Sequence, residues 1–313
     1  MRRQDSGAKV GWLAGLWARH PWLTLGASLV VVLALAFAGY AAVTAGAHQR
    51  AGRKLDEATR LLEAADKLVV QIDTVVSSEI TSALAEPAEA AAAKVESAAG
   101  QLKEAAALLN AATPNLAEAD QVRAQYLSSA VAARREMLAQ APSILAANAK
   151  AARALPASTE AWDQTLLAKT DSDKAVAQYN KLTPAGVKES SRLNKRASAE
   201  LAQARRLFVT AEEAFPEADF EPFIAYVDLR IEINALSRES DEAWLDDDLA
   251  KANRNTKIYN TKDSEAVALA KRLPVTPAQV VAAAYDEVVG AATDEYYAAR
   301  TRATKADANL RQR

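Results

Sequence analysis

The sequence predicts an all-α protein with a single N-terminal transmembrane helix, a long helical stalk or hairpin, and then an antiparallel multi-helix bundle. Alanine makes up about a quarter of the 313 residues, and it loses no side-chain entropy in a helix. Apolar residues recur at helical spacing along most of the chain, whereas alternation of period two never holds for more than a few residues. One long uncharged segment near the start is typical of a membrane span.

The uncharged segment, residues 21–47, is the first predicted element. A helix needs about 20 apolar residues to cross a bilayer, and this run is longer than that and carries no charge. Pro21 suits a first helical turn, and Trp22 and Tyr40 lie near the two edges, where interfacial aromatic residues are common. We expect an uncleaved signal-anchor helix. A cleaved signal peptide is the alternative, because residues 45–47 read Ala-Gly-Ala.

The charges around this segment bear on its orientation. Basic residues flank it about equally on both sides, so the positive-inside rule decides little. The preceding tail, residues 1–20, is short, and acidic residues outnumber basic ones beyond the segment. These two facts favour a single-pass protein of the cell membrane with a cytoplasmic N-terminus and a body outside the membrane.

Small residues recur at every fourth position in the predicted span, namely at Ala34, Ala38, Ala42 and Gly46. A stripe of this kind lets two membrane helices approach closely. It predicts pairing between copies of the chain. The alternative is a chance pattern in an alanine-rich sequence.

A heptad pattern begins just after the span. Large apolar residues alternate with alanines in steps of three and four, and they form a candidate helix-pairing seam at Leu55, Leu62, Val69, Ile72 and Val76. This seam predicts homo-oligomerisation. Pro87 opens a second patterned segment that runs to residue 112, so an antiparallel hairpin is the natural interpretation. A single kinked rod is the alternative.

The rest of the body predicts further helices separated by prolines. Thr113-Pro114 is expected to start a helix that fades at Leu155-Pro156. Two short helices are expected between Pro156 and Pro184. Later segments predict a helix over 186–214, ended by Phe215-Pro216, and helices beginning at 219, 241, 266 and 276, with a polar loop over 253–262.

The aromatic residues divide this body, because none occurs between Tyr40 and Tyr126 and the remaining ones all follow. Small Ala/Leu seams suit thin, close-packed helices, and aromatic residues suit a thicker core. The predicted divisions are a cytoplasmic tail over 1–20, the anchor over 21–47, a heptad-patterned stalk or hairpin over 48–155, and an aromatic-containing bundle over 156–313.

The available chemistry argues against an enzyme. There is no cysteine, and the two histidines, His20 and His48, both flank the predicted span. A Ser-His-Asp triad, a Cys-ligated metal site and the common nucleotide-binding glycine motifs are therefore not expected. We expect no cofactor and no metal. The net charge of −2 gives no reason to expect nucleic acid as a partner.

Two weaker candidates for binding remain in the body. The acidic run over 241–248 is either a site for calcium or a cationic partner, or a solvated helix start whose acids complement the helix dipole. A small-molecule pocket could form from aromatic residues spread over the bundle, namely Trp162, Phe208, Phe223, Tyr226 and Trp244.

The plan of one N-terminal membrane helix followed by a long helical body resembles that of LemA-like proteins and of spectrin-like septation-ring regulators. Tyr259-Asn260, followed by a proline-containing helix turn, is similar to the former. No functional residue follows from this resemblance. The alanine- and arginine-rich composition is typical of a chain from a high-GC bacterial genome.

These observations predict a membrane-anchored, non-enzymatic helical-bundle protein of the bacterial cell envelope that acts by protein–protein interaction or scaffolding. Its expected partners are the membrane, a second copy of the chain, or an envelope protein or polymer. One alternative is an extracytoplasmic domain that binds or senses a small molecule or polymer. Another is a division-type or cytoskeletal coupler whose body faces the cytoplasm.

Overall fold

The computed structural model describes the backbone of residues 21–312 and the side chains of residues 44–312. This part of the chain contains seven α-helices, two short 3-10 helices and no strand, which confirms the all-α prediction. The helices are α2 (Pro21–Val76), α3 (Ala85–Ala112), α4 (Glu118–Tyr179), α5 (Pro184–Ala214), α6 (Glu221–Leu245), α7 (Leu249–Ala270) and α8 (Pro277–Arg311), and the 3-10 helices are η1 (Ser82–Leu84) and η2 (Thr113–Asn115).

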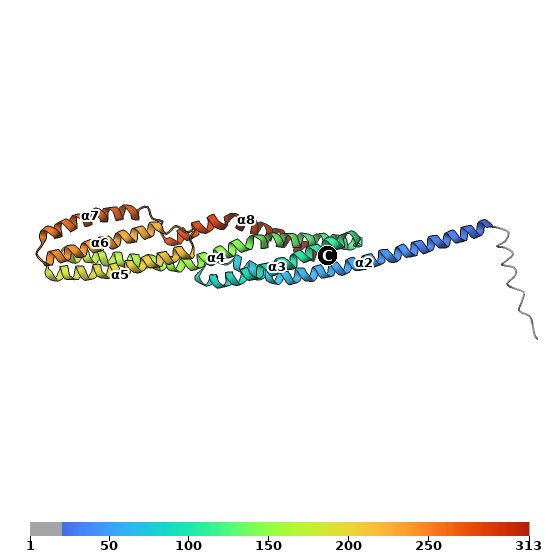
Figure 1. The fold of residues 1–313 in the computed structure, drawn as a ribbon, viewed down its shortest axis with the longest axis horizontal. Helices are drawn as coiled ribbons and strands as arrows, with labels where there is room; N and C mark the ends of the chain where they lie inside the picture. Colours follow the sequence, from blue (N-terminus) through green and yellow to red (C-terminus); the bar gives the residue numbers. More distant parts are fainter. Residues whose placement is uncertain (1–20, 313) are drawn as a thin grey trace, which may run out of the picture.

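The helices form one long rod with α4 as its shared axis (Figure 1). The first half of α4 packs with α2, α3 and α8, and we call this group the proximal bundle. The second half of α4 packs with α5, which packs with α6, which in turn packs with α7, and we call this group the distal bundle. The N-terminal part of α2 extends beyond the proximal bundle as a continuous helix.

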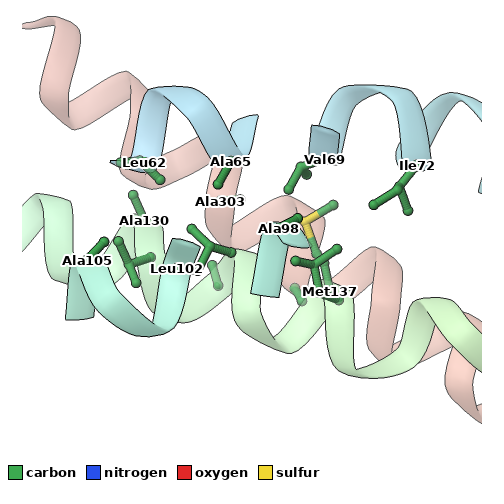
Figure 2. Close-up of a cluster of buried hydrophobic side chains, with 14 of the residues drawn as sticks. Leu62, Ala65, Val69, Ile72, Ala98, Leu102, Ala105, Ala130, Met137 and Ala303 are labelled. Carbon is green, nitrogen blue, oxygen red and sulfur yellow. The ribbon is translucent and has the colours of Figure 1, made fainter. Parts of the chain in front are cut away.

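The core of the proximal bundle is built from alanine and leucine stripes. Figure 2 shows α2 facing α3, α4 and α8 through small residues such as Ala65, Ala98 and Ala130, with larger ones such as Leu102 and Met137 between them. Alanines that are almost fully buried let the helix axes approach closely, because no long side chain separates them.

The predicted seam lies inside this core. Its residues are at most 6% exposed and pack against helices of the same chain, namely Leu55, Leu62, Val69, Ile72 and Val76. The seam therefore joins α2 to its own bundle. Pairing it with a second copy would first require the bundle to open.

An arginine ties three helices of the proximal bundle together. Arg134 of α4 is only 8% exposed, and its guanidinium donates to Asp66 of α2 and to Asp307 of α8. The contacts from Nη2 measure 3.0 Å to each carboxylate. Because the guanidinium fork satisfies two carboxylates at once, its burial is compensated.

Several predictions about helix boundaries in the body were wrong. The helix expected to fade at Leu155-Pro156 instead continues as α4 to Tyr179, through Pro142 and Pro156. Both prolines are exposed, while alanines on the opposite side of the helix stay buried. Packing on that buried side outweighs the local helix-breaking tendency.

The expected polar loop over 253–262 is also wrong, because these residues lie inside α7. Residues at helical spacing, Ala252, Asn255 and Ala266, face inward. The helix expected over 241–253 is in fact the end of α6, a turn over 246–248 and the start of α7.

The predicted helix start at Thr113-Pro114 is likewise only a 3-10 turn, η2, and α4 begins at Glu118. Two other boundaries agree with expectation. Thr276 precedes Pro277 at the start of α8, and α5 ends at Ala214 before Phe215-Pro216.

The buried residues fall mainly into two large hydrophobic clusters. The first spans Ala51 to Ala149 together with Val289 to Ala306 of α8. The second spans Ala151 to Val227 together with Val281 and Ala284, also of α8. Because α8 contributes to both clusters, the two bundles share two helices, and the predicted division at residue 155 stays a prediction.

Most of the predicted transmembrane span lies outside the residues whose side chains are described. Among residues 44–312, no helix combines the length and apolar character needed to cross a membrane. The span over 21–47 and its orientation therefore stay predictions. The backbone of these residues belongs to α2.

Replacing Arg134 with Met tests the buried ion triad. Loss of the guanidinium leaves Asp66 and Asp307 facing each other without a cation, and both are about one-third exposed. We expect a loss of about 2 kcal/mol in the free energy of unfolding, measured by denaturant unfolding of the full chain in mild detergent. The matched control, Arg135→Met, alters the exposed neighbour and should change stability little. Equal stability of the two variants would contradict the triad.

Candidate functional site

The interior of the distal bundle changes from apolar to polar towards its tip. Near the proximal bundle the core contains Phe208, Phe223 and small apolar residues. Towards the turns that join α4 to α5 and α6 to α7, buried polar residues take over, namely Asp171, Ser172, Ser190, Asn194, Asn234, Ser240, Asp241 and Asn255. We call this set the polar core. Such burial is unfavourable unless hydrogen bonds compensate it.

Hydrogen bonds in the polar core run from α6 to its neighbours. Ser172 of α4 donates to the Asn234 side chain over 3.0 Å, and Asn194 of α5 donates to Ser237 over 2.8 Å. The Ser240 hydroxyl lies 3.1 Å from the Ala252 carbonyl oxygen of α7. These contacts fix the register of α6 against three helices.

The polar core is nevertheless incompletely satisfied. Eight buried side-chain nitrogen and oxygen atoms among the described residues have no hydrogen-bond partner. Six of these eight belong to the distal bundle, on Asp171, Glu200, Asn234, Asp241 and Asn255, and Asp241 alone contributes two. Unsatisfied buried polar atoms are uncommon in folded proteins and mark places where a function or a ligand should be sought.

Asp241 is the most exceptional member of the polar core. Its side chain is 0% exposed, and neither carboxylate oxygen accepts a hydrogen bond. Burial raises its pKa from 3.8 to about 6. Ser190 and Asn194 of α5 face the carboxylate and oppose this shift in pKa, although neither bonds to it with normal hydrogen-bond geometry.

Asp171 shows how the bundle compensates another buried carboxylate. It is also 0% exposed, but it pairs with Arg196 of α5, and Lys174 lies 3.6 Å away. The bond from Arg196 is the main reason why the pKa of Asp171 is lowered. Asp241 has no corresponding ion pair among the described residues.

A groove passes over the polar core between α4 and α7. α7 packs along α6 on the outer edge of the bundle but barely meets α4 (Figure 1). The groove holds a pocket of about 120 Å³ near the tip, lined by Val176, Tyr179, Asn180, Ser237, Ser240, Asp241, Thr256, Tyr259 and Asn260. Asp241 forms part of its inner wall.

A second, wider pocket of about 390 Å³ adjoins the first. The two share Tyr259 as a common wall. Four of the five charged side chains that line the wider pocket are paired, since Arg230 contacts Asp263 over 2.7 Å and Lys169 contacts Asp173 over 2.6 Å. The α4–α7 groove therefore combines aromatic walls, neutral polar groups, neutralised ion pairs and one uncompensated carboxylate.

The aromatic residues predicted to form a pocket are only partly brought together. The Phe223 ring packs 5.4 Å from Trp162 and 5.3 Å from Phe208, and these three form a filled core. Tyr226 instead lines the wider pocket of the α4–α7 groove. Trp244 is half-buried near the end of α6.

The other sequence candidates occupy different places. Ala34, Ala38 and Ala42 of the membrane stripe lie outside the residues whose side chains are described, and Gly46 has open space around it. In the acidic run, Asp241 is buried, whereas Asp248 caps α7 by accepting from the Lys251 backbone over 2.9 Å. Within the described chain, no group of three metal-ligating side chains is close enough to hold an ion.

Most of the α4–α7 groove could not be predicted from the sequence. Tyr179, Ser237 and Thr256 gave no signal, because single polar residues on helices are usually exposed. Asp241 was noticed only as one of several acids. The available signal was the helical spacing of Asn255, Tyr259 and Ala266 within a polar segment.

Comparisons with family models, with curated proteins and with solved structures find no match to this chain. The resemblance to LemA-like proteins and septation-ring regulators therefore rests only on the overall plan and, for the former, on Tyr259-Asn260. Function has to be argued from the site itself.

Because the carboxylate of Asp241 is buried without an ion pair, we expect its ionisation to destabilise the fold as the pH rises. The pKa of Asp241 is higher in the folded chain than in the unfolded chain. Its contribution to the free energy of unfolding is therefore fully present below pH 4 and is lost as the pH rises to about 6. The shift from 3.8 to about 6 is equivalent to about 3 kcal/mol. Asp241→Asn should therefore raise the melting temperature at pH 7.5 and leave it nearly unchanged at pH 4.

The matched control is Asp163→Asn, which alters an exposed carboxylate on α4. Thermal unfolding of the full chain, followed by circular dichroism at both pH values, makes the comparison. A stabilisation of Asp241→Asn that is equal at both pH values would show that ionisation of this group is not the cause.

Proposed function

We propose that this protein is a membrane-anchored, non-enzymatic scaffold of the bacterial cell envelope that presents a binding groove at the end of a helical spacer. The main support for this proposal is that two features lie at opposite ends of the same rod. α2 enters the proximal bundle from the predicted span over 21–47. α6 and α7, which line the α4–α7 groove together with α4, lie at the other end of the rod (Figure 1).

The rod supports a spacer role through its length and its rigidity. α4 has 62 residues, which correspond to about 93 Å of helix. It has packing partners along both halves, so the rod does not depend on an isolated helix. A binding groove on such a rod can reach a partner well away from the lipid surface.

A non-enzymatic role is supported by the residues of the groove. The chain contains no cysteine, and both of its histidines lie near residues 21–47. The groove offers hydroxyls, amides, phenols and a carboxylate, which suit recognition of a ligand more directly than nucleophilic catalysis.

Binding or sensing of a small molecule or polymer is the second candidate function. The partly unsatisfied polar core behind the α4–α7 groove favours it, because a ligand could complete the missing hydrogen bonds. The two roles are compatible, since a spacer can carry a ligand-binding tip. A body that faces the cytoplasm remains an outcome of the experiment below.

Single cysteines can test the topology without ambiguity, because the natural chain has none. Leu249→Cys places a thiol at an exposed position near the distal tip, and Ser6→Cys places one in the predicted cytoplasmic tail. In intact cells or spheroplasts, a membrane-impermeant maleimide should label Leu249→Cys and spare Ser6→Cys. Both variants should fractionate with membranes.

Lysed cells provide the control, since both thiols should then react. Labelling of Ser6→Cys alone in intact cells would reverse the topology and favour the cytoplasmic coupler. Recovery of both variants in the soluble fraction would contradict the anchor itself.

A further inference from the structure

We propose that the 120 Å³ pocket of the α4–α7 groove binds an alkyl-ammonium group, with Asp241 as its counter-charge and Tyr179 and Tyr259 beside it. The ligand is a small organic amine or the side chain of a lysine residue. This inference goes beyond the scaffold role and holds whichever side of the membrane the body faces.

The inner wall of the pocket carries the carboxylate of Asp241, which has no ion pair. A carboxylate that is fully buried and unpaired is costly, and a cation in contact with it would recover much of that cost. Arg196 and Lys174 pair with Asp171, and Arg230 pairs with Asp263. Among the described residues, no cation is one of the groups that shift the pKa of Asp241. A cation from outside the chain can therefore supply the compensating charge.

The lining of the pocket is rich in hydrogen-bond acceptors. The hydroxyls of Ser240 and Thr256 lie 3.1 and 2.9 Å from the same Ala252 carbonyl oxygen, so each has an internal acceptor for its proton. The two hydroxyls also lie 3.0 Å apart, so one of them can donate to the other, and the two oxygens of Asp241 have no donor among the described residues. An ammonium group has three N–H donors and no acceptor, which matches such a lining better than an anion or a carbonyl group would.

The size of the pocket and its two tyrosines also suit an alkyl-ammonium group. Tyr179 of α4 and Tyr259 of α7 both line the pocket, and aromatic rings attract ammonium groups. The pocket volume corresponds to about four water molecules, which suits an ammonium group with a short alkyl chain. The wider pocket beyond Tyr259 leaves room for the rest of a longer ligand.

Isothermal titration of the full chain at pH 7.5 tests the inference with two probes. The probes are 1,4-diaminobutane and a short lysine-containing peptide, and 1-butanol is the neutral control. We expect saturable binding of at least one amine and no binding of 1-butanol. Binding of the diamine alone identifies a free amine as the ligand, and binding of the peptide alone identifies a protein partner. Binding of neither amine at millimolar concentration overturns the proposal.

Two variants test whether this pocket is responsible. Asp241→Asn keeps the size of the side chain and should weaken amine binding at least tenfold, while Asp163→Asn should bind as the natural chain does. Tyr259→Leu should weaken binding severalfold by removing one ring. Unchanged amine affinity in Asp241→Asn overturns the proposal. Because these measurements use purified protein, they fail or succeed independently of the topology experiment.

Discussion

The buried face of α4 is the constraint on which both bundles depend. Its stripe of small residues passes from the first hydrophobic cluster to the second between Ala149 and Ala151 without any break in the helix. α3 and α8 pack along the first half and α5 along the second. Pro142 and Pro156 face solvent and therefore leave this buried face free for packing. Burial on the inner side keeps the rod in one piece.

The buried residues differ in kind between the two ends of the rod. The proximal bundle buries alanine and leucine, with one arginine held by two carboxylates, so its interior mainly supplies stability. The distal tip buries amides, hydroxyls and an unpaired carboxylate, which cost stability. Proteins commonly break the rules of good packing where they function. The position of Asp241 behind an open groove, rather than in a closed core, is consistent with that pattern.

Most helices with an apolar buried face were predictable from the sequence, although the end of α4 was not, whereas the middle of α7, with its polar buried face, was predicted as a loop. The start of α8 at Pro277 followed from its apolar periodicity and from the preceding threonine. Only the two ends of α7 were predicted as helix, because the inward positions in its middle include Asn255 and the residues around it are polar. The stacked rings of Phe208 and Phe223 were assigned to a pocket although they fill the core, since sequence reveals aromatic character but not burial. The exceptional burial of Asp241 required the packing of three helices around it.

The continuity of α4 can be measured most directly by the distance between two spin labels on its exposed face. Cysteines introduced at Ser129 and Thr170, both exposed, bracket Pro142 and Pro156 in a chain that has no other cysteine. An unbroken helix predicts a narrow distance distribution centred near about 60 Å. A distribution that is much shorter or broad would show that the helix breaks at a proline. In that case the two bundles would not form one rod.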